Sequence, residues 1–379
     1  MKKILFYINN LGGGGAEKVL CDIVASLDKE NYDITVMSKY DDGTYVDSIK
    51  QLVKYRPLFK KVKPGKNLLK KLFNIIYTNV REHIFKFYPK LLYRLYIKQK
   101  FDIEIAFLEG YSTKVISGSN NKNSKKITWV HADLKQNHWT KECYRSFQDE
   151  VKCYKKFNTI VCVSESVADS FKEFYEIKQN VIVKYNPVNK LDILSKANEV
   201  IGFDKEQDTL TLVTVGRLVY QKGYDRLLKV CKTLKDEGFN FNLWIVGEGE
   251  QRNLLEKYIS ENKMEDTVKL LGFQSNPYKY IRHADLFVCS SRTEGFSLVV
   301  VESMIIGVPI ISTKCAGPTE LLDYGEYGIL VGNNEDSLYN GIKSVLLNQA
   351  VIKCYETKAK RKGECFSTEN TLLAIEEIF

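Results

Sequence analysis

The 379-residue sequence lacks several features that mark common protein classes. Its apolar runs are shorter than the ~18 to 20 residues of a membrane-spanning helix. The N-terminal MKKILFYINN turns polar at Asn9, which is too early for a signal peptide and typical of a first strand. Histidine is rare, with four residues, and the nine cysteines form no C-x-x-C pair, so neither a zinc site nor a disulfide framework is indicated. We expect buried, reduced thiols in a cytoplasmic protein that is soluble or bound peripherally to a membrane.

The signatures of dinucleotide and nucleoside-triphosphate binding are also missing. The glycine loop that begins at Gly12 has Glu17 where the fingerprint G-x-G-x-x-G has its third glycine. The second strand, residues 32–37, does not end on the acid that would hold a ribose, and no Gly-Lys-Ser/Thr follows to complete a P-loop. No D-x-D sequence is present to hold a metal ion. The missing third glycine and ribose acid argue against a dinucleotide oxidoreductase.

What the sequence does contain is an alternation of short apolar strands and amphipathic helices. A hydrophobic content of 44% and an aromatic content of 12% indicate a folded chain, and the length favours two domains. Strands are predicted near residues 101–108, 127–131, 159–164 and 181–185, and again near residues 210–216, 242–246, 268–271, 286–290 and 308–312. The series breaks at Asn186-Pro187, where we place the domain junction. The predicted fold class is α/β with parallel sheets.

The stretch from Asp285 to Pro309 predicts both a fold unit and a site. A helix at residues 297–306 lies between the strands 286–290 and 308–312, with Gly307 as its stop, which makes a βαβ unit. The turn before the helix carries Arg292, Glu294 and Gly295, and a helix N-terminus there would favour a phosphate group. Glu294 and Glu302 could accept hydrogen bonds from the hydroxyls of a nucleotide-sugar. The alternative is a surface helix with acidic ends.

Other strand ends repeat this chemistry. The glycine loop at residues 12–15 would let a ligand approach the backbone closely, although glycine loops also serve as plain turns. The strand 127–131 ends on His131, at the edge where α/β proteins bind ligands, while a lone histidine is more often structural. Arg217 and Lys222 follow the strand 210–216 and could neutralise a diphosphate. Alone they would be ordinary surface cations.

Residues 57–100 differ in composition from the rest of the chain. Twelve basic residues against one acid give this segment a charge of +11. Because the whole chain has a net charge of +9, the remaining residues together carry about −2. Aromatic and aliphatic side chains recur at helical spacing, and Pro89 opens a second predicted helix. The residues expected to face a membrane or an acceptor are Lys60, Lys61, Lys63, Lys66, Lys70, Lys71, Phe73 and Tyr77. We favour contact with an anionic membrane surface. A basic helix face in water is the alternative, and no nucleic-acid motif accompanies the charge.

Together these motifs resemble those of a known family. They are Gly12 to Glu17, Val130-His131, Gly216-Arg217 with Gln221-Lys222-Gly223, Gly247-Glu248-Gly249, and Glu294 with seven residues before Glu302. In this order the chain resembles a retaining GT-B glycosyltransferase of glycosyltransferase family 4, also called glycosyl transferases group 1. The resemblance covers nearly the whole chain. One departure is Cys315-Ala316-Gly317, where many relatives have two glycines.

The resemblance implies two Rossmann-like domains facing across a cleft. The expected ranges are 1–186 for the acceptor-side domain, 187–365 for the nucleotide-sugar domain, and 366–379 for a helix that returns to the first domain. The implied donor-binding residues are Gly14, Gly15, Arg217, Lys222, Gly272, Phe273, Glu294, Gly295, Phe296, Ser297 and Glu302. The implied catalytic residues are His131, Arg217, Lys222 and Glu294, with cations stabilising the departing diphosphate. Such enzymes generally retain the anomeric configuration and use no metal or cofactor.

The expected function is transfer of a hexose or N-acetylhexosamine from a nucleotide-sugar, expected to be a UDP-sugar, to a lipid-linked oligosaccharide in cell-surface polysaccharide biosynthesis. Capsule, exopolysaccharide and lipopolysaccharide assembly are the family's frequent roles. The expected location is the inner face of the plasma membrane. Two alternatives remain, a transferase with a soluble or protein acceptor and a non-catalytic partner subunit. The donor sugar, the linkage and the oligomeric state do not follow from the sequence.

Overall fold

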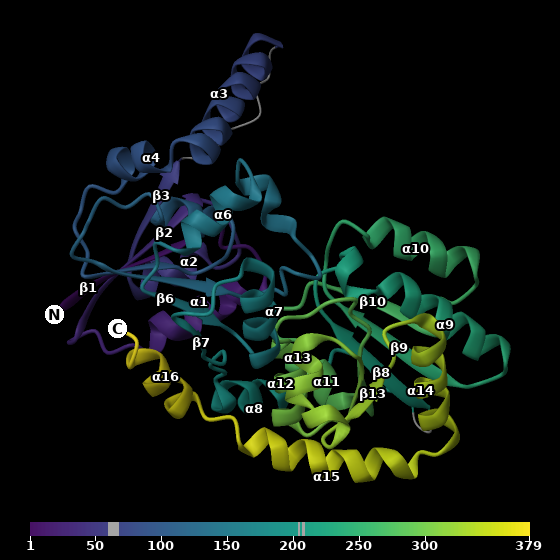
Figure 1. Ribbon diagram of the computed structural model, residues 1–379. Helices are drawn as coiled ribbons and strands as arrows, with labels where there is room; N and C mark the ends of the chain where they lie inside the picture. Colours follow the sequence, from purple (N-terminus) through teal and green to yellow (C-terminus); the bar gives the residue numbers. More distant parts are fainter. Residues whose placement is uncertain (60–67, 204, 207–208) are drawn as a thin grey trace. The chain divides into compact units, whose positions relative to one another are not determined.

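The computed structural model describes residues 1–59, 68–203, 205–206 and 209–379, with the backbone alone for 68–71, 73, 75 and 82. The chain forms two compact units (Figure 1). Unit 1 comprises Met1–Pro187 and Glu369–Phe379, and unit 2 comprises Val188–Thr368. The backbone therefore passes between the units twice, after Pro187 and after Thr368.

Unit 1 is built on a parallel sheet with the strand order β3-β2-β1-β4-β5-β6-β7. The strands are β1 (Lys2–Ile8), β2 (Tyr32–Tyr40), β3 (Lys54–Phe59), β4 (Ile103–Ala106), β5 (Lys125–Val130), β6 (Thr159–Cys162) and β7 (Val181–Val183). The inner strands are apolar on both faces because helices cover both faces of a parallel sheet. In β1, Ile4 to Ile8 are all fully buried.

The helices of unit 1 follow the strands. They are α1 (Gly15–Ser26), α2 (Val46–Leu52), α3 (Leu68–Phe87), α4 (Pro89–Tyr96), α5 (Tyr111–Ile116), η1 (Trp139–Cys143), α6 (Phe147–Tyr154) and α7 (Glu165–Tyr175). The C-terminal α16 (Thr368–Glu376) also belongs to this unit from Glu369 onward. Phe379 lies edge-on to Phe6 and Tyr32 at ring-centroid distances of 6.2 and 6.0 Å.

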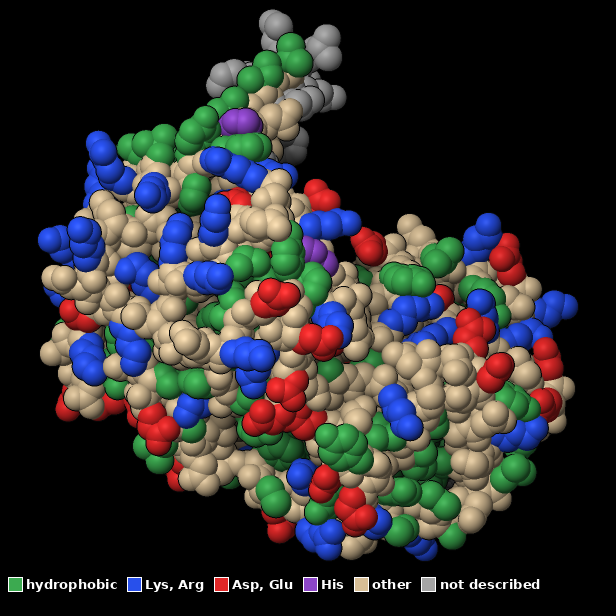
Figure 2. Space-filling view, viewed as in Figure 1, with side chains coloured by type: hydrophobic (Ala, Val, Ile, Leu, Met, Phe, Trp, Pro, Cys, Tyr) green, Lys and Arg blue, Asp and Glu red, His purple; other side chains and the backbone are tan. Residues whose placement is uncertain are grey.

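The described part of the basic segment from residue 68 onward contains α3 and α4, and Pro89 opens α4 as predicted. Large apolar side chains remain exposed along both helices, and Figure 2 shows them as a green band along α3 that continues over α4. We call Leu72, Ile76, Val80, Leu91 and Leu95 the apolar ridge. Of the predicted membrane-facing residues, Lys60, Lys61, Lys63 and Lys66 lie outside the described residues, as do the side chains of Lys70, Lys71 and Phe73, while Tyr77 is exposed. In the described part of the chain, no helix is long and apolar enough to cross a bilayer.

Unit 2 has a second parallel sheet, with the order β10-β9-β8-β11-β12-β13. Its strands are β8 (Leu210–Val215), β9 (Phe241–Val246), β10 (Val268–Gly272), β11 (Leu286–Cys289), β12 (Ile310–Thr313) and β13 (Ile329–Val331). Its helices are α8 (Lys190–Ala197), η2 (Tyr220–Lys222), α9 (Tyr224–Asp236), α10 (Arg252–Glu261), α11 (Tyr278–His283), α12 (Leu298–Ile306), α13 (Ala316–Leu321), η3 (Asp323–Gly325), α14 (Glu335–Leu347) and α15 (Ala350–Glu364).

The α/β fold class predicted from the sequence is confirmed in both units. The predicted βαβ unit is β11-α12-β12, and Gly307 ends α12 with a left-handed φ of +87°. All nine cysteines are free, and all except Cys354 and Cys365 are buried.

Candidate active site

The predicted donor residues of unit 2 gather at the carboxyl ends of two adjacent strands. β8 pairs with β11 in parallel, so the loop after β8 and the loop after β11 emerge side by side. The first loop carries Arg217 and, in η2, Lys222. The second carries Glu294 and leads into α12. Residues 72 positions apart in the sequence are therefore neighbours at this edge.

The centre of this edge is an ion pair between Lys222 and Glu294. Lys222 Nζ lies 2.5 Å from Glu294 Oε1, and the Ser291 hydroxyl donates to the same oxygen at 2.7 Å. Burial by itself would lower the pKa of Lys222, but the charge of Glu294 outweighs it and holds the pKa above its usual value. Lys222 is therefore a permanent cation at neutral pH.

The two loops are joined by main-chain and side-chain hydrogen bonds. Arg292 N donates to Gln221 O at 2.7 Å, and Gln221 Nε2 donates to Thr293 O at 2.9 Å. Ser290 Oγ donates to Lys222 O at 2.9 Å. Gly223 has a φ of +68°, and a Cβ there would lie 2.2 Å from the Ser290 carbonyl oxygen. The close approach of the two loops at this point therefore requires glycine.

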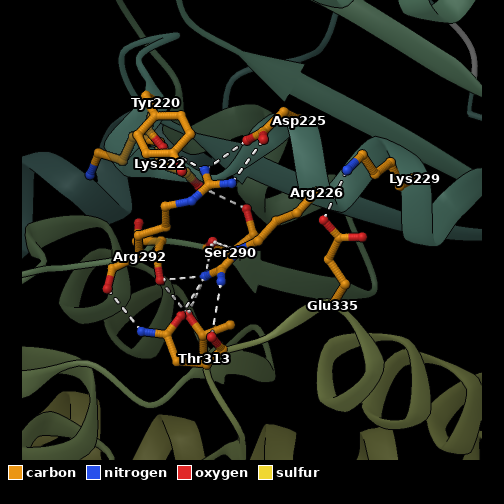
Figure 3. Close-up of polar contacts among 11 residues, drawn as sticks. Tyr220, Lys222, Asp225, Arg226, Lys229, Ser290, Arg292, Thr313 and Glu335 are labelled. Carbon is orange, nitrogen blue, oxygen red and sulfur yellow. Dashed lines mark hydrogen bonds and ion pairs between the residues drawn. The ribbon is translucent and has the colours of Figure 1, made fainter.

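Arg292 braces the same junction from the side (Figure 3). Its guanidinium makes two hydrogen bonds to Asp225, at 2.7 and 2.8 Å, and lies over the Tyr220 ring at 3.8 Å. Hydrogen bonding to Asp225 raises the pKa of Arg292. The sequence placed Arg292 in a phosphate-favouring turn, whereas the structure joins it to α9 and η2. It is a fork-shaped link between elements.

Arg226 is a buried hub beneath the loops (Figure 3). Its guanidinium donates to the carbonyl oxygens of Ser290 and Ser291 and to Asn333 Oδ1, at distances of 2.6 to 2.9 Å. Carbonyl oxygens at strand ends have no partner in the sheet, so one buried arginine satisfies several of them. It thereby fixes where the loop after β11 begins.

The predicted residues around α12 lie close to Glu294. Ser297 is the N-cap of α12 with a left-handed φ of +71°, and its buried hydroxyl has no hydrogen-bond partner within the described chain. Glu302 is buried in the second turn, where the Tyr278 hydroxyl donates to its Oε1 at 3.3 Å. Gly317 N donates to Glu294 O at 3.0 Å. The Cys315-Ala316-Gly317 segment, which departs from the family pattern, therefore holds the main chain of Glu294.

The remaining predicted residues of unit 2 differ in exposure. Arg217 is exposed, and its guanidinium makes no hydrogen bond or ion pair with any residue that the structure describes. Gly272 ends β10, where its carbonyl oxygen accepts from Gly247 N at 2.8 Å. Phe273 follows it and is exposed. Gly295 and Phe296 connect Glu294 to the N-cap of α12.

In unit 1 the predicted residues occupy the corresponding strand ends. Gly14 is the N-cap and Gly15 the first residue of α1, after β1. His131 follows β5, and its main-chain N–H donates to Glu109 Oε2 at 2.9 Å. Burial lowers the pKa of His131 to about 4, so the imidazole is neutral at pH 7. Burial also raises the pKa of Glu109, to about 7.

Several residues of these clusters were not found from the sequence. Ser291, Asp225, Arg226 and Glu109 act through partners that are distant in the chain. For Arg226 a signal was present, because it interrupts the apolar face of α9 formed by Tyr224, Leu227 and Leu228. In the described part of the chain, no group of His, Cys, Asp or Glu side chains is arranged to hold a metal ion.

Comparison with known proteins gives these clusters a context. Residues 196–362, nearly all of unit 2, match the family model described as glycosyl transferases group 1. Over 372 residues the chain is 27% identical to the N-acetylgalactosamine-N,N'-diacetylbacillosaminyl-diphospho-undecaprenol 4-alpha-N-acetylgalactosaminyltransferase of Campylobacter jejuni, covering 97% of this chain and 96% of that protein. It is 25% identical to an uncharacterized glycosyltransferase of Haemophilus influenzae, covering 98% of both.

Solved structures with the same fold cover the whole chain. Anabaena HepE in complex with UDP and glucose superposes with a TM-score of 0.77 at 19% identity, covering 100% of this chain and 99% of that one. S. aureus TarM superposes with a TM-score of 0.74 at 15% identity, and the match covers 100% of this chain and 98% of the TarM chain. The fold is the GT-B architecture of these transferases. The chain is therefore a glycosyltransferase of the GT-B fold, and its unit 2 matches the glycosyl transferases group 1.

Proposed function

We propose that this glycosyltransferase moves a hexose or N-acetylhexosamine from a UDP-sugar to a lipid-linked saccharide in cell-surface polysaccharide biosynthesis. The observation that carries the donor half is the Lys222–Glu294 pair, a cation and a carboxylate held together at the strand edge that leads into α12. The acceptor half is supported by the Campylobacter jejuni relative, whose name specifies a diphospho-undecaprenol-linked substrate and which matches 97% of this chain.

The donor roles follow from charge and hydrogen-bonding capacity. Lys222 and Arg217 bind the diphosphate and stabilise the charge that develops as it leaves. Arg217 is free to do so, because its guanidinium is exposed and makes no ion pair inside the described part of unit 2. Glu294 accepts hydrogen bonds from hydroxyls of the transferred sugar, and Glu302 accepts them from the ribose. Main-chain atoms of Gly272 and Phe273 face the base.

In the reaction, the bond between the sugar C1 and the diphosphate oxygen breaks, and the electron pair leaves with the UDP. The acceptor hydroxyl forms the new bond on the same face, and its proton passes to the departing phosphate, so the anomeric configuration is retained. Neutral His131 contacts the transferred sugar as a hydrogen-bonding group without adding charge. Gly14 and Gly15 allow close backbone approach to the phosphate. No metal takes part.

We also propose that α3 and α4 hold the enzyme on the inner face of the plasma membrane. The apolar ridge is exposed, and the exposed cations Lys90, Arg94 and Lys98 lie on or beside α4. Apolar side chains that enter the lipid boundary, flanked by cations near anionic headgroups, are the two components of peripheral membrane binding. A lipid-linked acceptor would then be presented at the same surface.

The test is donor-dependent stabilisation followed by transfer. We expect UDP and one UDP-sugar, among UDP-Glc, UDP-Gal, UDP-GlcNAc and UDP-GalNAc, to raise the melting temperature of the wild type, because a ligand stabilises the state that it binds. Lys222→Ala and Glu302→Ala should lose this shift, while a substitution of exposed Lys257 to Ala on α10 should keep it. Incubation of the radiolabelled donor with a polyprenyl-diphospho-saccharide should yield an organic-soluble product. Transfer only to water-soluble saccharides or proteins would contradict the acceptor class, and the absence of any nucleotide shift would indicate the non-catalytic partner.

A further inference from the structure

An exposed tryptophan lies beside Gly110, in the loop that follows β4 of unit 1. Trp139, the first residue of η1, is 38% exposed, whereas the other two tryptophans, Trp129 and Trp244, are 1% and 2% exposed. Indole has a large apolar surface whose burial stabilises a protein by several kcal/mol in order of magnitude. Its exposure at the candidate site therefore indicates a surface that a ligand covers.

The loop after β4 links this indole to the candidate site. Glu109 Oε2 accepts a hydrogen bond from the main-chain N–H of His131 at 2.9 Å, and the next residue, Gly110, lies against the Trp139 ring. Glu109 follows β4 and His131 follows β5, and these strands are paired. Two consecutive residues, Glu109 and Gly110, thus contact His131 and Trp139 respectively.

A second buried carboxylate fixes the residues on either side of Trp139. Glu150 of α6 is fully buried, and the Thr140 hydroxyl donates to its Oε1 at 2.6 Å while its Oε2 lies 2.7 Å from His138 Nε2. Below the ring is Gly110, where a Cβ would lie 3.0 Å from Trp139 Cη2. The indole is therefore held in one orientation and packs on Gly110, although more than a third of its surface remains in water.

We propose that Trp139 is a stacking platform for a pyranose ring of the acceptor saccharide, positioned by Gly110 and Glu150. This proposal rests on the proposed function and names the sugar-binding element of the acceptor side. A pyranose presents an apolar face of C–H groups and a rim of hydroxyls, which suits a rigid aromatic surface with amides nearby. Gln136 and Asn137, in the same loop, are exposed amides that can donate to and accept from such hydroxyls.

The experiment uses the protein's own fluorescence. Because Trp139 is the one exposed tryptophan, acrylamide quenches mainly its emission. The probes are the methyl α-glycosides of glucose, galactose, GlcNAc and GalNAc, and we expect at least one to protect the wild type from quenching. Trp139→Phe, which keeps an aromatic face, should bind that glycoside within about threefold of the wild type by calorimetry. Trp139→Leu, which keeps an apolar side chain but no aromatic face, should bind about tenfold more weakly.

Equal glycoside affinities of Trp139→Phe and Trp139→Leu would overturn the proposal, because a ring that only packs on Gly110 tolerates either residue. Absence of protection by every glycoside would overturn it as well, and so would protection by sugar-free anionic vesicles alone, which would place Trp139 at a membrane. Stabilisation by UDP, measured on both variants, separates the two proposals. If UDP stabilises them and the wild type alike, the donor site is intact and only the platform is in question. If UDP stabilises none of them, the proposed function itself is wrong.

Discussion

At the scale of single residues, three titratable groups have environments that make their contribution to stability measurable. Lys222 and Glu294 share an ion pair that is largely removed from water, and Glu109 is a buried carboxyl that accepts a hydrogen bond from the His131 main chain. A buried charge without its partner is costly, whereas removal of both partners is often nearly neutral. Stability measurements can therefore separate the pair from its parts.

Lys222→Met leaves the Glu294 carboxylate without its cation, and we expect it to lower the free energy of unfolding of unit 2 by about 2 kcal/mol. The double variant Lys222→Met/Glu294→Gln should recover most of that loss, since no charge remains unpaired, yet it should stay inactive in sugar transfer. The coupling energy is measured by urea unfolding of four proteins in a double-mutant cycle. They are the wild type, Lys222→Met, Glu294→Gln and the double variant. Additive losses, with the double variant losing the sum of the two single losses, would show that the pair contributes nothing to stability.

Glu109 should give the protein a distinctive pH dependence. Its folded pKa of about 7 lies above its ordinary value of 4.5, so between these values the native state keeps a proton that the unfolded chain has released. The free energy of unfolding then falls as pH rises through this window and levels off above pH 7. Glu109→Gln has no titratable group at this position. Relative to this variant, the free energy of unfolding of the wild type should fall by up to about 3 kcal/mol across this pH window.

Urea unfolding of both proteins at pH 5, 6, 7 and 8 measures this difference, in which the titrations of other groups cancel. His131 has the opposite effect in both proteins, because its lowered pKa makes stability rise between about pH 4 and its ordinary value of 6.5. Parallel profiles for the wild type and Glu109→Gln would mean that Glu109 is ionised throughout the window.

At the scale of elements, the loops after β8 and β11 depend on a bidentate link. Lysine cannot reproduce the fork of Arg292 on Asp225 or its stacking on Tyr220, so Arg292→Lys should loosen η2 and weaken UDP-sugar binding about tenfold. Asp225→Asn should have a similar effect. The double variant should be no worse than either single one, because both act through one contact. Calorimetric titration with the donor checks this, and additive losses would contradict a shared role.

The apolar ridge gives the second prediction at this scale. Ile76 is 53% exposed on α3, and Ile76→Asp should lower partition onto anionic vesicles at least tenfold, because it removes apolar contact and adds repulsion. Leu254 is 57% exposed on α10 of unit 2, so Leu254→Asp is a matched control that should leave partition unchanged. Vesicle co-sedimentation measures both variants. Unchanged partition of Ile76→Asp would favour a transferase with a soluble acceptor and a basic helix face in water.

At the scale of the whole molecule, the chain ends on the unit in which it began. Ile375 of α16 is 1% exposed and Leu373 is 60% exposed in the same helix. We expect Ile375→Ala to lower the stability of unit 1 by about 2 to 4 kcal/mol, as for other buried isoleucines, and Leu373→Ala to have little effect. Differential scanning calorimetry measures both. Equal, small effects would show that α16 does not stabilise unit 1.

The sequence by itself determined the parallel α/β architecture, because strand and helix periodicities, glycine stops and the break at Asn186-Pro187 are local signals. It also indicated which strand ends carry polar chemistry, among them His131, Lys222 and Glu294. Whether a segment is a helix or a strand, and where a strand ends, can be predicted without knowing which distant residues it contacts.

Only the tertiary structure decided how those residues are held. The pairing of β8 with β11 sets Lys222 beside Glu294, and the pairing of β4 with β5 brings His131 to the Glu109 carboxylate. The sequence predicted Arg292 in a phosphate-facing turn, whereas the tertiary structure pairs it with Asp225. Hydrogen bonds between residues far apart in the chain depend on strand order, and periodicity does not encode that order. The exposure of Trp139 has the same origin, because burial is a property of the packed chain.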